Sequence, residues 1–253
     1  MQLEGSTALV TGSNRGIGRA IAEALAGAGA EVLAGVRSLD RLHGLDDMPT
    51  VEPVRVDLSS PDAIESSFRE LGPRSDRIDI LVNNAGVFAG GLLERQDVAR
   101  LYELMQVNLA GPIHLTRLVL PGMLERGRGK VVNNASIIGH APFPGAAAYA
   151  ASKTGLHGFS ESLRRELAET ELTVLELVTP GVDTEMMDQV KAELAEHSDT
   201  EGWDHVEPAD WARQVLTAIE SDDHELNPGG GERLAKLLPK ALLDLAAKRA
   251  FDR

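Results

Sequence analysis

Short apolar runs alternate with alanine- and leucine-rich amphipathic segments along most of this chain. The apolar runs predict strands at 6–11, 31–36, 51–57, 78–83, 129–135 and 172–178. The amphipathic segments predict helices near 16–28, 61–71, 97–126 and 150–170. The predicted strands are continuous apolar runs, which is typical of parallel strands covered on both faces. The regular alternation therefore predicts one α/β domain built on a doubly wound parallel sheet.

Glycine and proline mark the interruptions in this pattern. Gly111-Pro112 is expected to divide the long 97–126 helical region into two, and Pro73 to Arg77 and Pro228 to Gly231 are predicted to be loops. Residues 231–253 then predict an amphipathic helical tail with a leucine-rich face and a net charge of +3. We expect this tail to pack on the acidic body of the protein, to join a partner subunit or to rest on a membrane surface, in that order.

A glycine-rich segment follows the first predicted strand. It reads Thr11-Gly12-Ser13-Asn14-Arg15-Gly16-Ile17-Gly18 and leads directly into a helical pattern. Glycines let the backbone approach a ligand closely, and a helix N-terminus offers free N–H groups and the positive end of its dipole. The segment therefore predicts a cradle for a diphosphate, with a plain strand-to-helix turn as the alternative.

Tyr149 and Lys153 lie four residues apart, so a helix would place them on one face. A positive charge beside a phenol stabilises its anion, which would let the phenol exchange protons nearer neutrality than its usual pKa of about 10. Ser136 precedes Tyr149 by thirteen residues and could hold a substrate oxygen. The tyrosine-lysine spacing alone is weak evidence, and the glycine segment supports it independently.

With these motifs the chain resembles the short-chain dehydrogenase/reductase family, over roughly residues 5 to 220. The glycine spacing G-x-x-x-G-x-G is that of the single-domain members, whose fold is Rossmann-like. Further motifs stand in the family's order: Val56-Asp57-Leu58, Asn83-Asn84-Ala85-Gly86 and Val107-Asn108-Leu109-Ala110-Gly111.

This resemblance implies a catalytic tetrad of Asn108, Ser136, Tyr149 and Lys153. Tyr149 would be the general acid in carbonyl reduction and the general base in alcohol oxidation, and Ser136 would bond the substrate oxygen. Lys153 would lower the pKa of Tyr149 and bind the nicotinamide ribose. Asn108 would position a water that links Lys153 to solvent. Two alternatives stay open: Asn108 could only bond its own backbone, and Ser136 could be a turn residue.

The resemblance also implies the residues that bind the cofactor. They are Gly12, Ser13, Asn14, Arg15, Gly16, Ile17, Gly18, Arg37, Asp57, Leu58, Asn84, Ala85, Gly86, Tyr149, Lys153, Val182 and Thr184. Asp57 would contact the adenine ring, Asn84 and Ala85 would lie beside the adenosine ribose, and the backbone of Val182 would contact the nicotinamide amide.

Charge predicts which dinucleotide is preferred. In this fold an acidic side chain near the end of the second strand bonds the ribose 2′-hydroxyl of NAD. Here Val36 holds that position, Arg37 follows it, and Arg15 lies in the glycine segment. Two guanidinium groups suit a 2′-phosphate, so we expect NADP(H) to be preferred over NAD(H). The alternative is that Arg37 is a solvated loop residue.

The substrate pocket is expected at the carboxyl ends of the strands. Its expected residues are Phe88, His140, Phe143 and Met186. Their character predicts an apolar pocket, although core packing explains such residues equally well. A loop histidine such as His140 is more often structural than an acid or base.

Residues 183–205 are expected to form a mobile lid, which carries eight acidic residues and one lysine. A lid of this sign should repel polyanionic substrates such as coenzyme A thioesters, which favours a neutral carbonyl or alcohol. Alternatively, the acids only solvate a helix face.

Composition narrows the classes of function. The net charge of −14 argues against nucleic-acid binding, and the chain contains no 18-residue apolar span and no cysteine. Because the first predicted strand begins at residue 6, we expect no leader peptide. These features predict a cytoplasmic protein without disulfides. The histidines lack metal-binding spacing, so we expect no catalytic metal.

The sequence therefore predicts an NADP(H)-dependent oxidoreductase that exchanges a hydride between nicotinamide and a carbonyl or secondary alcohol, as a homodimer or homotetramer. The domain would span 1–230, followed by the tail. One alternative is a catalytically silent, NADP(H)-binding regulatory protein on the same fold. Another is a sugar epimerase or dehydratase, for which the chain is short and its glycine spacing differs.

Overall fold

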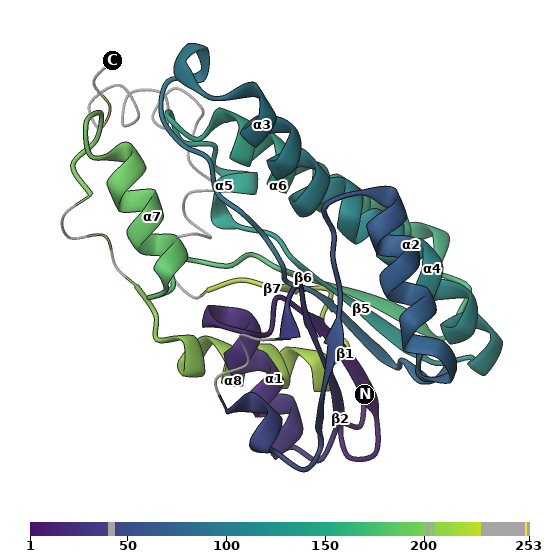
Figure 1. Cartoon of the computed structure of the whole chain (residues 1–253). Coiled ribbons are helices and arrows are strands. Elements are labelled where there is room, and N and C mark those ends of the chain that lie inside the picture. The colour runs from purple at the N-terminus through teal and green to yellow at the C-terminus, as the bar shows by residue number, and fades with distance from the viewer. Residues whose placement is uncertain (40–43, 201–202, 204, 229–250, 252–253) are drawn as a thin grey trace.

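Seven parallel strands form one central sheet in the computed structural model of the protein (Figure 1). The structure describes residues 1–39, 44–200, 203, 205–228 and 251, and the statements below concern these residues. The strand order is β3-β2-β1-β4-β5-β6-β7, with every neighbouring pair parallel. The doubly wound α/β architecture predicted from the sequence is therefore confirmed.

The strands are β1 (Thr7–Thr11), β2 (Glu31–Val36), β3 (Val51–Arg55), β4 (Ile80–Asn83), β5 (Gly129–Asn134), β6 (Leu172–Leu177) and β7 (Glu225–Leu226). The helices are α1 (Gly16–Gly27), α2 (Pro61–Leu71), α3 (Val98–Met105), α4 (Gly111–Arg126), α5 (Ile137–His140), α6 (Ala147–Glu166), α7 (Glu185–Leu194) and α8 (Pro208–Glu220). Short 3-10 turns span Leu45–Asp47, Gly72–Arg77 and Leu93–Arg95.

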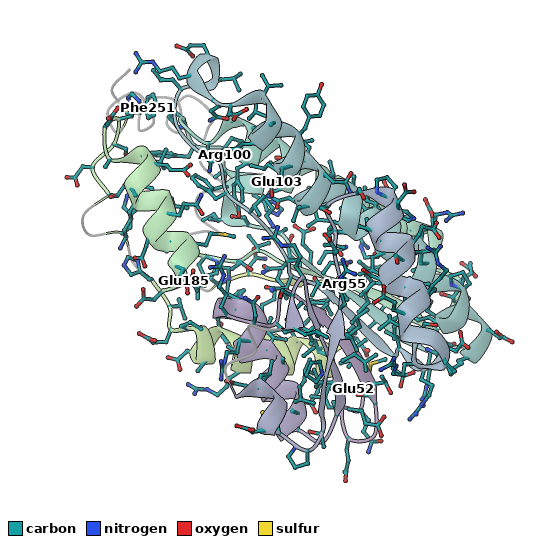
Figure 2. The ribbon with its side chains drawn as sticks, viewed as in Figure 1. Glu52, Arg55, Arg100, Glu103, Glu185 and Phe251 are labelled. Carbon is teal, nitrogen blue, oxygen red and sulfur yellow. The ribbon has the colours of Figure 1, made fainter. Side chains whose placement is uncertain are left out.

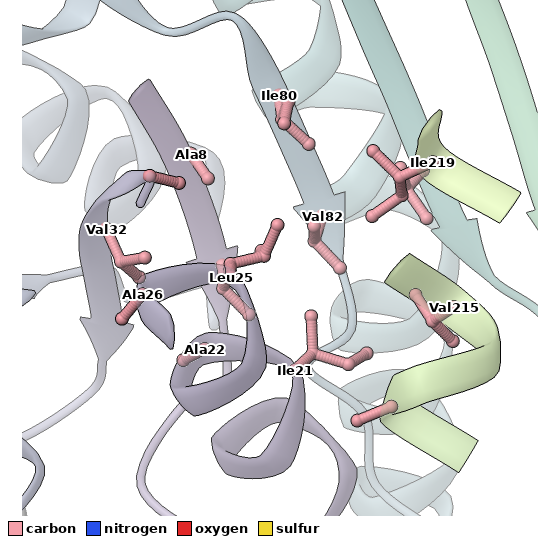
Figure 3. Close-up of a cluster of buried hydrophobic side chains, with 14 of the residues drawn as sticks. Ala8, Ile21, Ala22, Leu25, Ala26, Val32, Ile80, Val82, Val215 and Ile219 are labelled. Carbon is pink, nitrogen blue, oxygen red and sulfur yellow. The ribbon is translucent and has the colours of Figure 1, made fainter. Parts of the chain in front are cut away.

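The sheet separates two apolar cores, because successive side chains of a strand point to opposite faces. In β1, Ala8 and Val10 join the core beneath α1 and α8, whereas Leu9 joins the core beneath α2, α4 and α6. Figure 3 shows the first core, where Ile21 of α1 and Val215 of α8 meet beneath the strands. Covering both faces explains why β1, β2 and β4 are mainly apolar.

The helix α2 shows why its predicted bounds, 61–71, match the structure. The Ser60 hydroxyl caps the N-terminus by accepting from the Ala63 N–H, and Pro61 occupies the first turn. Gly72 follows the last helical residue with φ +56°, a conformation that suits glycine and ends the helix.

Two predicted interruptions were wrong. Residues 73–77 were expected to be a loop, but they belong to the 3-10 turn Gly72–Arg77. Gly111-Pro112 does not divide the 97–126 region, because a π-helical turn, Gln106–Ala110, joins α3 to α4 without a break. Pro112 has no N–H to donate, and the π-helical turn lies directly before it, where the Gly111 N–H bonds the Gln106 carbonyl oxygen.

Two further expectations concern the C-terminal part and the membrane. The tail predicted at 231–253 lies outside the described residues except for Phe251, whose ring centroid is 5.3 Å from that of His197. None of the helices in the described part of the chain has the length and hydropathy needed to cross a bilayer.

Candidate active site

The glycine segment between β1 and α1 approaches other backbone closely. Gly12 (φ +69°) and Gly16 (φ +54°) adopt left-handed conformations that favour glycine. A Cβ on Gly18 would lie 2.3 Å from both the Gly12 carbonyl oxygen and Asn84 Nδ2. Only glycine therefore fits at this third position of α1.

The N-terminus of α1 suits an anion. Its cap residue, Arg15, forms no side-chain capping bond, and no acidic residue lies in the first turn. By contrast, α2 and α7 are capped by the hydroxyls of Ser60 and Thr184. Because free N–H groups and the helix dipole favour negative charge, this N-terminus fits the predicted diphosphate.

The carboxyl ends of three strands are linked by side chains. The Thr11 hydroxyl accepts from the backbone N–H groups of Asn84 and Ala85, each at 2.9 Å. The Asn84 amide donates to the Thr11 carbonyl oxygen at 2.9 Å and accepts from Asn134 Nδ2 at 2.8 Å. Asn134 had no predicted role in the site, and Thr11 was predicted only as the first residue of the glycine segment.

Asn108 lies in the π-helical turn and is 1% exposed. Its Oδ1 accepts from the Val87 N–H and its Nδ2 donates to the Val87 carbonyl oxygen, both at 2.8 Å. Nδ2 also lies 3.3 Å from the Ser152 hydroxyl oxygen. Asn108 thus fixes the backbone just after Asn84-Ala85-Gly86 rather than bonding its own backbone, which rules out that alternative here.

Ser136, Tyr149 and Lys153 are buried around one point. Tyr149 and Lys153 lie one turn apart on α6, with the Lys153 Nζ 5.7 Å from the centroid of the tyrosine ring. Nζ donates to the Asn134 carbonyl oxygen at 2.8 Å. Ser136 caps the short helix α5 and also hydrogen-bonds with Tyr149. The structure therefore brings the four residues of the predicted tetrad to the carboxyl ends of β4 and β5.

Burial controls the protonation of this pair. Burial raises the pKa of Tyr149 to about 12, against an opposing effect of the hydrogen bond with Ser136. Burial lowers the pKa of Lys153 to about 8. Lys153 was expected to lower the pKa of Tyr149, but in this structure the loss of solvation dominates and the shift has the opposite sign. Tyr149 therefore keeps its proton at neutral pH, as a proton donor must, although the raised pKa makes it a weaker acid than an ordinary phenol.

The residues predicted to select the cofactor lie at the corner between β2 and α1. Arg37 follows the last residue of β2 and is exposed. Arg15 is also exposed and pairs with Glu185 at the start of α7. The Asp57 carboxylate accepts from the Ser59 N–H at 2.9 Å, so it stabilises the turn after β3.

Leu58, Val182 and Thr184 are further residues that were predicted to bind the cofactor. Leu58 is 5% exposed, and its carbonyl oxygen accepts from Gln106 Nε2 at 3.0 Å. Val182 pairs with Val206 in an isolated parallel bridge. A Cβ on Gly16 would lie 3.1 Å from Thr184 Cγ2, so the start of α7 rests against the glycine segment.

Apolar side chains surround Tyr149. Phe88 packs edge-on against its ring with a centroid distance of 5.1 Å. Phe143 and Met186 join the same cluster, in which Phe143 lies 5.8 Å from Trp203. Three of the four predicted pocket residues thus gather around the tyrosine.

His140, the fourth predicted pocket residue, is not part of this apolar cluster. Its Nε2 lies 2.8 Å from Glu176 Oε1, because β6 places that carboxylate behind α5. His140 therefore has a structural partner, as the alternative expected, and its role in the pocket stays a prediction.

The helix α7 is tied to the loop after β4, and Figure 2 shows Arg100 on the side of α3 facing it. Glu193 accepts from the Gly90 N–H at 2.6 Å, from Arg100 Nη2 at 2.8 Å and from Gln189 Nε2 at 2.8 Å. Burial raises the pKa of Glu193, but these three hydrogen bonds outweigh it and the pKa is lowered. Glu193 therefore fastens α7 to α3 and to the loop after β4, which is more than the solvation of a helix face that was one of the two alternatives for the lid acids.

Comparison with known proteins agrees with this geometry. A family model described as short chain dehydrogenase matches residues 6–195. The chain is 37% identical over 189 residues to the 3-oxoacyl-[acyl-carrier-protein] reductase FabG of Vibrio cholerae, covering 74% of this chain and 77% of that protein. A short chain dehydrogenase from Burkholderia cenocepacia in complex with NADP has a TM-score of 0.83 at 29% identity, covering 98% and 99% of the two chains. A variant of actinorhodin polyketide ketoreductase with NADPH has a TM-score of 0.80 at 31% identity, covering 90% and 97%.

Proposed function

The chain belongs to the short-chain dehydrogenase family, and we propose that it is an NADP(H)-dependent oxidoreductase that reduces a small neutral carbonyl compound with Tyr149 as the proton donor. One observation carries this proposal above others. A protonated, buried tyrosine bonded to Ser136 lies within an apolar cluster and beside a buried lysine.

The proposed chemistry divides between cofactor and protein. When bound, NADPH supplies the hydride. The Ser136 hydroxyl holds the carbonyl oxygen, and Tyr149 donates its proton to that oxygen as the carbon is reduced. The products are an alcohol and a phenolate, which regains its proton from solvent. The protein thus contributes orientation and one proton.

Three residues position this chemistry. Lys153, which the Asn134 carbonyl oxygen holds in place, would bind the nicotinamide ribose and favour the phenolate by its charge. Asn108 fixes the Val87 backbone beside the apolar cluster. We also propose that Asn108 holds a water molecule that serves as a proton relay.

The proposed preference for NADPH rests on Arg37 and Arg15. Both guanidinium groups are exposed near the end of β2, where the fold places the adenosine ribose. The pairing of Arg15 with Glu185 leaves Arg37 as the better candidate for the 2′-phosphate. Comparing the dissociation constants of NADPH and NADH tests this, and equal affinities would contradict it.

The proposed substrate is neutral because the exposed side of α7 is acidic. Asp183, Glu185 and Asp188 are exposed at its N-terminal end, and Glu196 follows its C-terminal end. Negative charge at the pocket entrance disfavours polyanionic carriers. The resemblance to acyl-carrier-protein reductases makes acyl thioesters the main competitor, and higher activity on one than on every neutral ketone would overturn this part.

The decisive experiment follows NADPH oxidation with ketones, aldehydes, quinones, steroids and acyl thioesters, in parallel with NADH. We expect turnover with NADPH and a clear preference within the panel. Tyr149→Phe should abolish turnover while NADPH binds nearly as before. If wild type and Tyr149→Phe both bind NADPH and neither turns over any compound, the alternative of a silent regulatory protein is favoured.

A further inference from the structure

Three ligand-bearing side chains meet behind the catalytic residues. His140 ends α5, His157 lies on α6 and Glu176 lies in β6. His140 Nε2 is 2.8 Å from Glu176 Oε1, and His157 Nδ1 is 2.9 Å from Oε2 and 3.1 Å from Oε1. In the described part of the chain, this is the one group of three such residues whose ligand atoms all lie within 4.8 Å of one another.

The burial of this cluster makes the negative charge of the Glu176 carboxylate unfavourable in free energy. The Glu176 side chain is 4% exposed and that of His140 is 10% exposed, whereas His157 is 33% exposed. Among the described residues, the carboxylate pairs with these two histidines and with no lysine or arginine. A buried carboxylate without a permanent cation is unfavourable unless positive charge is brought to it.

We propose that His140, His157 and Glu176 bind a divalent first-row transition cation of the Zn²⁺ or Co²⁺ type. Two imidazole nitrogens and one carboxylate are a preferred ligand set for these ions. Metal–ligand bonds of about 2.05 Å give a tetrahedron with edges of about 3.3 Å. Glu176 Oε1 lies 2.8 Å from His140 Nε2 and 3.1 Å from His157 Nδ1, so these two separations need to widen by about 0.5 and 0.2 Å. The exposed edge of His157 lets water occupy the fourth position.

The arrangement of the two imidazole rings supports the proposed metal site. The two imidazoles pack edge-to-face, with centroids 4.4 Å apart and an angle of 61° between planes. Each presents one nitrogen to the carboxylate and is held by its own element of structure. The ligand atoms therefore converge from the end of α5, from α6 and from β6, which is a preorganised arrangement.

A cation here would be structural rather than catalytic. Ser136 caps α5 at one end and His140 ends it, while His157 lies one turn beyond Lys153. The Thr154 hydroxyl already donates to the Gly139 carbonyl oxygen at 2.8 Å, so α5 and α6 are in contact. The cation would fix the helix that carries Ser136 against the helix that carries Lys153, without touching substrate.

The experiment titrates the full chain, freed of any histidine tag and stripped with a chelator, with Co²⁺ and then Zn²⁺. We expect one equivalent of Co²⁺ to bind with the visible absorption of a tetrahedral site, and Zn²⁺ to displace it. At 100 times Kd, Zn²⁺ should raise Tm by about 5–10 °C. Glu176→Gln and His157→Ala should each raise Kd by more than about tenfold, because even indirect ligand partners have effects of that size.

His114→Ala is the matched control. His114 also faces a carboxylate, that of Glu65 at 3.4 Å, but this partly buried pair has no third ligand among the described residues. Its loss should leave the metal affinity unchanged. An absent tetrahedral Co²⁺ spectrum in the wild type, or equal Kd values for wild type and Glu176→Gln, would overturn the proposal. The wild-type spectrum decides the question even if a variant fails to fold.

Discussion

The same substitution, glycine to alanine, should have opposite effects at two helical positions of this protein. Gly18 and Gly158 both lie inside helices, α1 and α6, where alanine is favoured over glycine by about 1 kcal/mol. A Cβ on Gly158 meets nothing within 4 Å. Gly158→Ala should therefore stabilise the protein by about 0.5–1 kcal/mol.

At Gly18 the added methyl group has no space. It would lie 2.3 Å from the Gly12 carbonyl oxygen and from Asn84 Nδ2, about 1 Å inside ordinary contact. The Gly12 oxygen belongs to the backbone, and Asn84 Nδ2 is a side-chain atom whose position is fixed by its hydrogen bond to the Thr11 carbonyl oxygen. Gly12 is held by its N–H bond to the Gly35 carbonyl oxygen at 2.8 Å, and Asn84 is held by Thr11. We expect Gly18→Ala to destabilise the protein by about 2–3 kcal/mol, at the upper end for overpacking.

Urea unfolding, followed by tryptophan fluorescence, measures the difference. The two variants should differ by about 3 kcal/mol, which separates their midpoints by about 1 M at an m-value of about 3 kcal/mol/M. Gly18→Ala should also weaken NADPH binding, since the glycine segment must move, whereas Gly158→Ala should leave it unchanged. If Gly18→Ala raises the urea midpoint of unfolding as Gly158→Ala does, the close packing of Gly18 against Gly12 and Asn84 is wrong.

Three further predictions follow from the site. Burial lowers the pKa of Lys153 from 10.5 to about 8, so the folded state loses this proton first and stability should rise with pH from about 8 to 10. The rise in the free energy of unfolding amounts to about 3 kcal/mol up to pH 10.5, and Lys153→Met should remove it. Urea unfolding curves of both proteins at pH 7.5 and 10 test this. Glu193→Gln should raise the substrate KM about three- to tenfold by weakening the hold on α7; Glu196→Gln is the control, and equal KM values would contradict the role of Glu193. Arg37→Glu should raise the Kd of NADPH by about tenfold or more and leave that of NADH nearly unchanged, whereas a parallel loss of both would indicate damage to the fold.

Local signals explain what the sequence could predict. The strand 31–36 and the helix 61–71 have the predicted bounds, because their apolar runs end at residues that favour turns or caps. The glycine segment and the tyrosine-lysine pair are likewise local, since each motif lies within one turn or one helix. The helix α8 was not predicted, although Pro208 in its first turn and Trp211 with Val215 and Ile219 at helical spacing were available signals.

The features that were missed depend on contacts between distant segments. The polar pair Asn133 and Asn134 was not assigned a role in the predicted strand. Asn133 accepts from Asn83 on the neighbouring strand at 2.9 Å and donates to Ser160 at 2.9 Å. The separation of His140, His157 and Glu176 along the chain gives no metal-binding spacing, and only the packing of two helices on β6 brings them together. Charge counting could not show that Glu193 has three donors, because these donors come from α3, α7 and the loop after β4.

The helix α7 contacts both halves of the site: Thr184 and Glu185 meet the glycine segment, and Glu193 holds the loop beside the apolar cluster. A helix fastened in this way makes the two binding events thermodynamically linked, because each ligand favours the same position of one element. Such linkage is reciprocal. If the bound dinucleotide raises the affinity for the carbonyl compound by a given factor, the bound carbonyl compound must raise the affinity for the dinucleotide by the same factor. It does so through slower dissociation or faster association of the dinucleotide.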